Sequence, residues 1–441
     1  MKIVSNQENS ITLYLQEWKK YSPGYYRELK DIYFNRVDTH SLISTLAQSG
    51  ILQINELRQG LSIETSSYVG KIQLENVQIV IEPKIEEFEL LHLLRYAYNL
   101  RNLKLLSSTH FSFTSNIFHD ILIFQLINEI RELFKKNLLR RYQRLEEDLA
   151  IPRGQINVNK YACKYQTETF AIPCIYYPRV KNCIFNQVLL AGLVLAQGMT
   201  DDQFLKINIK KLIYLFKDEI ETIPLSSQLL DRVFQKMNRL WNSYLPTLKI
   251  IEILYHSNAI SFKMNERKIS LPGFLFDMNH FFQALVSRFF HDYLPEFHVT
   301  DQYRLQGMIN YLPEYNPKNR KSPTPRPDFI IQEDGKIVAI IDTKYRDLWE
   351  NNLPPDMLYQ LAIYALSQSD NPTSIILYPV SHSYAQEARL VVNEPTLGRV
   401  RATIILRPIN LLQIEEIIKE KDIIYNQRAG NSYARSLVFG D

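Results

Sequence analysis

The pattern of hydrophobic and polar positions divides the chain into three parts, and residues 1–115 form the first. Short apolar runs between polar turns predict strands in this part, and two longer stretches have the period of helices. The predicted strands are at 11–15, 51–54, 67–74 and 77–81, and the predicted helices are at 39–48 and 86–105. We therefore expect a small β-rich N-terminal domain.

Residues 116–265, the second part, have mainly the period of helices. Apolar residues recur three and four positions apart, which predicts helices at 116–149, 182–196, 203–215 and 229–244. The segment 151–158 interrupts this pattern, because its Pro152 and Gly154 favour a turn into a short strand. We expect a mainly helical connector.

Residues 266–441, the third part, mix the two periods. The pattern predicts a helix at 277–290, strands at 303–311, 329–331 and 337–341, a helix at 354–366, strands at 374–378, 390–392 and 401–406, and a closing helix at 409–419. A helix, three strands, a helix and a strand give the order αβββαβ. The whole chain is therefore predicted to be an α+β protein of several domains.

The central hairpin of this third part brings acidic residues together. Its loop, Glu333-Asp334-Gly335, has the composition of a tight turn. With a three-residue loop, Asp328 opposes Ile340 and shares a face with Asp342 and Lys344, because side chains alternate along a strand. A two-residue Asp-Gly turn puts Asp328 on the other face unless a bulge corrects the register. A shared face therefore predicts an odd loop or a bulge.

Two carboxylates at the end of a strand are typical of a site for Mg²⁺, which prefers oxygen ligands and keeps several waters. We expect Asp328 and Asp342 to bind the cation, with the carbonyl oxygen of Thr343 as a third ligand. The ammonium group of Lys344 would orient or deprotonate the attacking water and offset the charge of a phosphate. These residues predict a metal-dependent nuclease.

The triplet Asp342-Thr343-Lys344 is a weak signal by itself, since an acid two positions before a lysine occurs five other times in the chain. The apolar strand before it, the Pro327-Asp328 pair upstream and the helix that follows make it more specific. The alternative is an ordinary core hairpin with an incidental acid and lysine on its surface.

Other residues around the hairpin are candidates for support or for DNA contact. Gln360 and Tyr364 are four positions apart on the following helix, so they share a face that supports the site or touches a DNA phosphate. The Pro-rich, basic segment 317–326 either contacts the DNA backbone or is a solvated loop. The candidates for DNA binding are Lys318, Arg320, Lys321, Arg326, Tyr345 and Arg346.

Composition limits how the protein can bind nucleic acid and in which cellular compartment we expect it. The net charge is only +4, so contact with nucleic acid must depend on local basic patches. Three cysteines without metal-ligand spacing, Cys163, Cys174 and Cys183, are typical of free thiols in a reducing compartment. The longest apolar run, 188–196, is too short to span a membrane, and no apolar leader begins the chain. We expect a cytoplasmic protein without a nucleotide site of its own, because no phosphate-binding loop is found.

Several separated stretches together carry a family resemblance: Tyr68-Val69-Gly70, Ile81 to Ile85, Arg153 to Ile156, Asn182 to Leu195 with Asn186, Asp277 to Phe282, Arg326-Pro327-Asp328, Asp342 to Tyr345 and Tyr359 to Tyr364. They span nearly the full length. The chain resembles the McrC family, the endonuclease subunits of McrBC-type, 5-methylcytosine-specific restriction systems. The hairpin and its surroundings also match the pattern of the PD-(D/E)XK nuclease superfamily.

The resemblance implies a C-terminal PD-(D/E)XK core that cuts double-stranded DNA with Mg²⁺. It also implies a hexameric GTP-hydrolysing AAA+ partner with its own DNA-recognition domain, which the N-terminal and middle parts dock into and stimulate. Two positions depart from the family pattern. Gln283 follows Phe282 where the family often has glutamate, which would weaken a second metal position, and Lys181-Asn182-Cys183 lacks an expected acid.

Three functional hypotheses follow. The first is an Mg²⁺-dependent endonuclease that works with the AAA+ partner. The second is an adaptor that activates the AAA+ ring and has a degenerate nuclease domain, for which Gln283 is the favouring feature. The third is a structure-specific nuclease that needs no motor.

Overall fold

The chain divides into two compact units. Unit 1 combines residues 1–102 with 262–441, and unit 2 is 103–261. The computed structural model describes residues 2–5, 11–85, 87–100, 118–164, 171–200, 202–258, 261–264, 267–270, 273–368, 372–380, 384–419 and 423–440. The predicted division into three domains, with boundaries at residues 115 and 265, stays a prediction.

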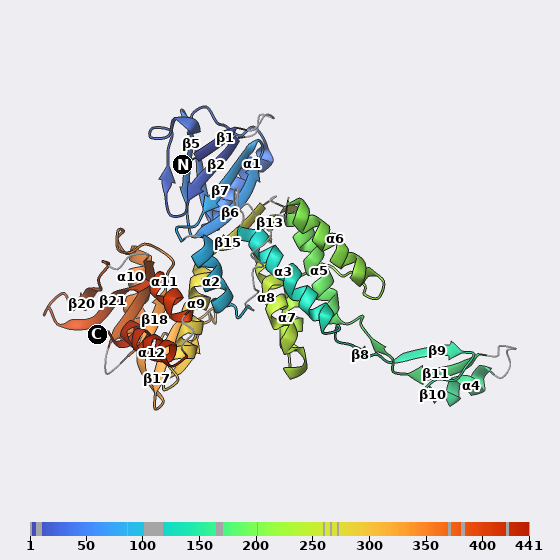
Figure 1. The fold of residues 1–441 in the computed structure, drawn as a ribbon. Helices are drawn as coiled ribbons and strands as arrows, with labels where there is room; N and C mark the ends of the chain where they lie inside the picture. The colour runs from blue at the N-terminus through green and yellow to red at the C-terminus, as the bar shows by residue number, and fades with distance from the viewer. Residues whose placement is uncertain are drawn as a thin grey trace. The chain divides into compact units, whose positions relative to one another are not determined.

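The N-terminal part of unit 1 is β-rich (Figure 1). Its five-stranded sheet has the order β1-β2-β7-β6-β15, and a smaller sheet has the order β3-β5-β4. The strands are β1 Lys2–Ser5, β2 Ile11–Gln16, β3 Lys20–Tyr21, β4 Leu52–Leu57, β5 Gly60–Thr65, β6 Tyr68–Leu74, β7 Val77–Glu82 and β15 Gly273–Asp277. The helices are η1 Arg27–Leu29, α1 Val37–Gln48 and α2 Glu87–Ala97. Residues 101–105 of the helix expected at 86–105 lie outside the described residues.

Unit 2 is mainly helical. Its helices are α3 Phe118–Lys135, α4 Val158–Lys164, α5 Ile184–Met199, α6 Gln203–Lys217, α7 Ser227–Gln235, η2 Arg239–Tyr244 and α8 Leu245–Asn258. Short strands form two small sheets: β8 Arg141–Tyr142, β9 Leu145–Leu149, β10 Gln155–Ile156, β11 Ile172–Tyr176 and β12 Arg179–Val180. Two further strands, β13 Ser261–Met264 and β14 Arg267–Ser270, pair with each other, and apart from Ser261 they belong in sequence to unit 1.

The prediction of one helix over 116–149 is wrong in its second half. Helix α3 ends at Lys135, and Asn137 takes a left-handed φ of 61°, a conformation that commonly terminates a helix. Beyond this point β9 pairs with β11. Cys174, on β11, and Cys183 are buried free thiols, whereas the side chain of Cys163 lies outside the described residues.

The C-terminal part of unit 1 is a six-stranded sheet in the order β16-β17-β18-β19-β21-β20, with helices packed against it (Figure 1). The strands β16, β17 and β18 are antiparallel neighbours, and β18, β19 and β21 run parallel. The elements are α9 Met278–Tyr293, β16 His298–Asp301, η3 Pro313–Tyr315, β17 Phe329–Glu333, β18 Lys336–Thr343, α10 Pro355–Leu366, β19 Thr373–Val380, β20 Ala388–Asn393, β21 Val400–Asn410, α11 Leu411–Lys419 and α12 Ile423–Phe439. The predicted α+β architecture is confirmed.

The strand expected at 303–311 is wrong, and the strand at this point of the order is β16, which ends at Asp301. The next residue, Gln302, has a left-handed φ of 52°, and Gly307 has a φ of 78°. These positive φ values turn the chain away from the sheet, so the apolar residues of 303–311 do not continue a strand. Helix α12 was not predicted.

The hairpin between β17 and β18 has a two-residue turn and a bulge. Asp334 and Gly335 have φ values of 48° and 79°, the pair of left-handed residues that a type I′ turn requires. The pairing register shifts next to Ile331, where β18 contains one extra residue, Val338. The sequence predicted either a three-residue loop or a two-residue turn with a bulge, and the structure has the two-residue turn with the bulge.

The two faces of this sheet pack against different helices. On one face, Ile330 and Ile340 are completely buried in a cluster that includes Leu361 of α10. On the other, Phe329 meets Phe290 of α9 edge to face, with ring centroids 5.8 Å apart. Burial of each such side chain stabilises the fold by about 1.5–3 kcal/mol, so the strand ends are held in a rigid core.

The N-terminal and C-terminal parts of unit 1 share one sheet. Strand β15 pairs antiparallel with β6, from Gly273 opposite Ile72 to Asp277 opposite Tyr68. Asp277 then caps α9, because its side chain accepts a hydrogen bond from the N–H of Asn279 at 2.9 Å. The start of α9 is therefore fixed by the N-terminal sheet.

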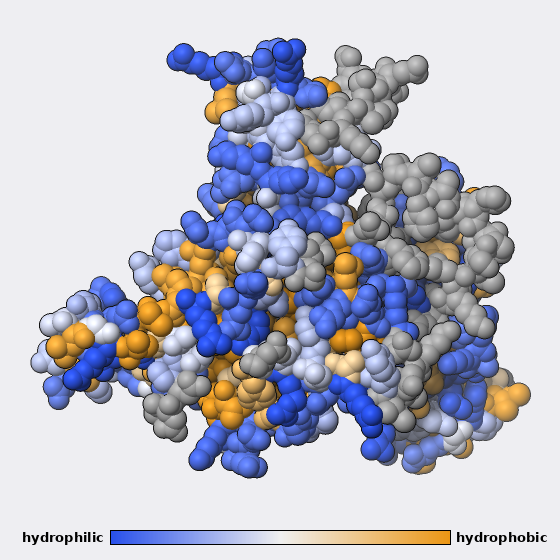
Figure 2. All heavy atoms as spheres, turned by 60° about the vertical axis from the view of Figure 1, so that its left-hand side comes forward, coloured by the Kyte–Doolittle hydropathy of each residue, from blue (hydrophilic) through white to orange (hydrophobic). Residues whose placement is uncertain are grey.

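Hydrophilic residues predominate on the face drawn in Figure 2, with smaller groups of hydrophobic residues between them. Among the described residues, no helix combines the length and the apolar character needed to cross a membrane.

Candidate active site

The candidate catalytic residues lie where β17 begins and β18 ends. These strands are antiparallel, so the start of one is beside the end of the other. Phe329 pairs with Ile341, and one further step in the same register brings Asp328 opposite Asp342. The expectation that Asp328 opposes Ile340 is therefore wrong, because it assumed the longer loop. The bulge brings the side chains of both aspartates to the same face of the hairpin.

The carboxylate of Asp328 accepts four hydrogen bonds. The side-chain amide groups of Gln283 and Gln302 donate to its Oδ1 at 3.0 and 2.8 Å. The backbone N–H and the hydroxyl group of Thr343 donate to its Oδ2 at 2.8 and 2.7 Å. These four donors fix the orientation of the carboxylate.

Asp342 is only 2% exposed, and its Oδ2 forms an ion pair with Nζ of Lys344 at 2.7 Å. Burial and the neighbouring charge of Asp328 raise the pKa of Asp342 to about 6, against the opposing effect of Lys344. Burial alone would lower the pKa of Lys344, but Asp342, Asp328 and Asp356 outweigh it, so this pKa is raised. Lys344 is therefore held as an ammonium ion, which suits charge stabilisation and water orientation better than proton abstraction.

Helix α10 contributes two polar side chains near the two aspartates, Gln360 and Tyr364. Gln360 donates a hydrogen bond to the hydroxyl oxygen of Tyr364 at 2.6 Å. Tyr364 is buried, and burial together with Asp342 and Asp328 raises its pKa to about 12. The tyrosine therefore stays neutral, and it lies within electrostatic reach of both carboxylates.

The oxygen ligands available here fit a hard divalent cation. Asp328 contributes to the raised pKa of Asp342, and a cation would relieve this repulsion between carboxylates. In the part of the chain that the structure describes, no group of three or more His, Cys, Asp and Glu residues is arranged to hold a metal ion. The chain would thus supply two carboxylates, and backbone oxygen and water would fill the remaining coordination positions of the cation. Mg²⁺ accepts such a set of ligands, whereas structural zinc sites use four protein ligands.

The basic candidates differ in their accessibility. Lys318, Arg320, Lys321 and Arg326 are all exposed. Tyr345 is 3% exposed, which removes it from the surface that DNA would touch. The half-buried guanidinium group of Arg346 lies 5.1 Å from the centre of the Trp18 ring, a cation–π arrangement.

Gln302 is a site residue that the sequence did not indicate. Besides its side-chain bond to Asp328, its backbone N–H donates to the Asp328 carbonyl oxygen at 2.7 Å. No local pattern marks this glutamine, since it precedes Asp328 by 26 residues and approaches it only through the pairing of β16 with β17.

The fold of the whole chain is similar to that of a solved archaeal protein. In the refined half-complex from a tetradecameric assembly of Thermococcus gammatolerans McrB AAA+ hexamers with bound McrC, one chain aligns with a TM-score of 0.59. The identity is 16%, and the alignment covers 96% of this chain and 99% of that one. The Thermococcus gammatolerans McrBC complex also aligns, with a TM-score of 0.46, 16% identity, and coverage of 64% of this chain and 88% of that one.

Sequence comparison gives the family. None of the curated proteins matches this chain. Residues 63–379 match the family model described as McrBC 5-methylcytosine restriction system component. This match covers well over half of the sequence, from within β5 to the last residues of β19. The chain therefore belongs to the McrBC family of 5-methylcytosine restriction system components.

Proposed function

We propose that this chain is the endonuclease subunit of an McrBC-like restriction system and cleaves double-stranded DNA with Mg²⁺. The observation that carries the proposal is the meeting of Asp328, Asp342 and Lys344 at one edge of a rigid sheet. The order of helices and strands around this edge, from α9 to β19, supports a PD-(D/E)XK core. This chemistry would act in the cytoplasm.

The chain's own residues divide the work. Asp328 and Asp342 would hold Mg²⁺, with the Thr343 carbonyl as a further oxygen ligand. Bound Mg²⁺ would supply Lewis-acid stabilisation of the phosphate and lower the pKa of a bound water. Lys344, kept positively charged by its neighbours, orients the water and offsets charge on the phosphate. The exposed basic segment with Lys318, Arg320, Lys321 and Arg326 would hold the DNA backbone.

The partner would be a hexameric McrB-like AAA+ GTPase, whose activity this chain stimulates. The support is the likeness to a chain of an assembly of McrB AAA+ hexamers with bound McrC, together with the family match. Docking would use the β-rich N-terminal part and the helical middle, and cutting would use the C-terminal part.

Replacement of Asp342 by Asn tests the assignment. Asp342→Asn keeps the shape of the side chain but removes its charge, so cleavage of 5-methylcytosine-containing plasmid with Mg²⁺, GTP and the partner should fall about a hundredfold or more. The protein should remain as stable as the unsubstituted form, because the substitution removes the repulsion from Asp328. The matched control is Asp334→Asn, in the triplet Asp334-Gly335-Lys336 at the exposed turn, which should cut at the normal rate.

Equal cleavage by Asp342→Asn and the unsubstituted protein would contradict the assignment. Partner GTPase stimulation, measured on the same samples, separates loss of cutting from loss of assembly.

A second candidate function is an adaptor that activates the AAA+ ring without cutting. Gln283 favours it, because this residue donates an amide hydrogen to Asp328 where an acid would add a metal ligand. Undiminished GTPase stimulation with no cleavage by the unsubstituted protein, on methylated and unmethylated DNA, would support the adaptor.

A further inference from the structure

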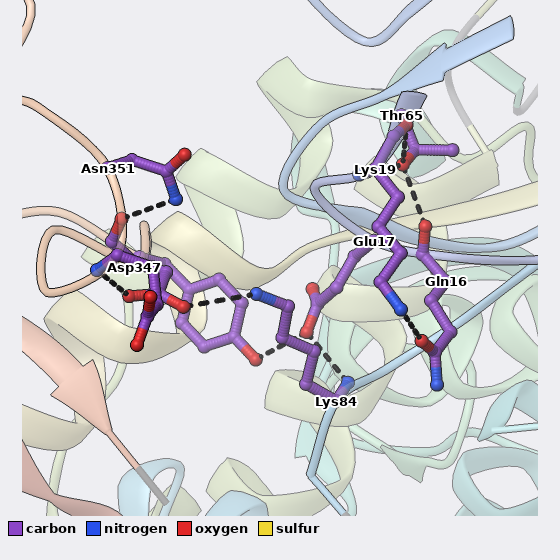
Figure 3. Close-up of polar contacts among 9 residues, drawn as sticks. Gln16, Glu17, Lys19, Thr65, Lys84, Asp347 and Asn351 are labelled. Carbon is purple, nitrogen blue, oxygen red and sulfur yellow. Dashed lines mark hydrogen bonds and ion pairs between the residues drawn. The ribbon is translucent and has the colours of Figure 1, made fainter. Parts of the chain in front are cut away.

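The side chain of Glu17, from the N-terminal part, reaches the residue that follows Lys344. Glu17 lies directly after β2, and its side chain is completely buried. Its Oε1 accepts a hydrogen bond from the hydroxyl group of Tyr345 at 2.8 Å and another from the backbone N–H of Lys84 at 2.8 Å. Figure 3 shows the Glu17 carboxylate pointing toward the Lys84 backbone.

This contact is costly for a carboxylate. Burial raises the pKa of Glu17 to about 7, although bonds from Lys84 and Tyr345 oppose the shift. Its other oxygen, Oε2, is buried without a hydrogen-bond partner. An apolar side chain would avoid both penalties, so packing alone does not account for an acid at this position.

Tyr345 is also held at its backbone. Its N–H donates to Oδ1 of Asn279 at 3.1 Å, and the side-chain amide of Asn279 donates to the hydroxyl group of Ser67 at 2.6 Å. The Tyr345 ring packs edge to face on Phe282, with ring centroids 6.0 Å apart. Glu17 thus binds the hydroxyl group of Tyr345, and Asn279 binds its backbone N–H. We call this arrangement the Tyr345 clamp.

The clamp adjoins the candidate active site on two sides. Pairing of β18 with β19 ends at Thr343, and the N–H of Lys344 makes one last bond, to the Leu377 carbonyl oxygen at 3.0 Å. Directly after that bond, Tyr345 is held by Glu17 and Asn279. Asn279 is also one helical turn before Gln283, the donor to Asp328, so both sides of the site depend on the start of α9.

We propose that Glu17 is a positioning residue of the nuclease site, which acts through Tyr345 to fix Lys344 and Asp342. The inference rests on the proposed function and adds to it that the N-terminal part completes the active site. In this view a residue more than 300 positions away in sequence sets the geometry of the catalytic lysine.

The experiment compares full-length variants assembled with the McrB-like partner. Tyr345→Phe removes only the hydroxyl group, and Glu17→Leu removes its acceptor. Glu17→Gln retains an oxygen that accepts the same two bonds. The matched control is Glu415→Leu, which removes another buried carboxylate that joins the same two parts of the chain, through a 2.9 Å contact with His92.

Three readouts are measured: single-turnover cleavage with saturating DNA, DNA affinity in Ca²⁺, and Mn²⁺ affinity of the chain alone by calorimetry. Tyr345→Phe and Glu17→Leu should each slow cleavage by about tenfold and weaken Mn²⁺ binding by about tenfold, with DNA affinity unchanged. The double variant should be no slower than the slower single variant, because both changes break one contact. Glu17→Gln and Glu415→Leu should cut within about twofold of the normal rate.

Normal cleavage and Mn²⁺ binding by folded Tyr345→Phe would overturn the clamp while leaving the nuclease assignment intact. An equal loss in Glu415→Leu would overturn it too, since that result would indicate a general effect of weakening the two-part contact. If Glu17→Leu fails to fold, Tyr345→Phe carries the test. Absence of cleavage by the unsubstituted protein would overturn the proposed function, and with it the clamp.

Discussion

Buried carboxylates in this protein differ in what offsets their burial. Asp342 has the ammonium group of Lys344 at 2.7 Å, whereas Glu17 has only neutral hydrogen-bond donors within bonding distance. Both have raised pKa values, about 6 and about 7, with burial as the largest cause. A charged Glu17 is therefore retained at the expense of stability near neutral pH.

Stability should consequently depend on pH through Glu17. The pKa of Glu17 is 4.5 in the unfolded chain and about 7 in the folded protein. The contribution of Glu17 to folding stability is therefore fully present below about pH 4.5 and is lost as the pH rises to about 7. The glutamine of Glu17→Gln does not titrate. When the pH is raised from about 4 to about 8, the free energy of unfolding of this variant should therefore increase by up to about 3 kcal/mol relative to that of the unsubstituted protein. Chemical unfolding at both pH values measures this gain.

The comparison at about pH 4 serves as the control, because Glu17 is then neutral in both states. A gain that is the same at both pH values would show that Glu17 is not the titrating group.

At the scale of elements, alternation along β17 and β18 predicted a shared face for Asp328 and Asp342 only on condition of an odd loop or a bulge, and the structure contains the bulge. The register was not predictable, because the extra residue, Val338, looks like any other apolar residue of a strand. The contacts of Gln302 with Asp328 and of Glu17 with Tyr345 could not be predicted from the sequence for another reason. They span 26 and 328 residues and arise only when distant strands pair.

Helix α9 makes residue 283 part of the site whatever its identity, because the helix packs beside the start of β17. Gln283→Glu would replace an amide donor to Asp328 with a third carboxylate. Repulsion should then lower the melting temperature without divalent cations by a few degrees, corresponding to about 1 kcal/mol. Added Mg²⁺ should raise it by more than in the unsubstituted protein. Thermal unfolding with and without Mg²⁺ measures both effects.

The control for this change is Gln413→Glu, the same substitution at an exposed position of α11, which should respond to Mg²⁺ like the unsubstituted protein. A melting temperature of Gln283→Glu that does not depend on Mg²⁺ would argue against a cation at the two aspartates.

For the whole molecule, unit 1 is discontinuous in sequence. Its C-terminal part depends on the N-terminal part through the pairing of β15 with β6, through the Tyr345 clamp and through a 2.8 Å hydrogen bond from Tyr96 of α2 to Asp292 of α9. The segment 266–441 therefore lacks part of its supporting structure when it is separated from residues 1–102.

A fragment of residues 262–441 expressed alone should consequently be insoluble or should unfold at a lower temperature than unit 1 in the intact protein. Separation exposes the apolar residues of α9 and β15 that face the N-terminal part, together with the unpaired edge of β15. Co-expression with residues 1–102 should restore solubility, which is measured by co-purification of the two fragments. A fragment that is stable and monomeric alone would contradict this dependence.

The pairing of β6 with β15 also has a consequence for biosynthesis. A ribosome makes β6 about two hundred residues before β15, so the N-terminal sheet stays incomplete while all of unit 2 is translated. During that interval the edge of β6 is open to pairing with other nascent chains. Translation speed and chaperone access over the stretch that encodes unit 2 thus become determinants of the yield of correctly folded protein.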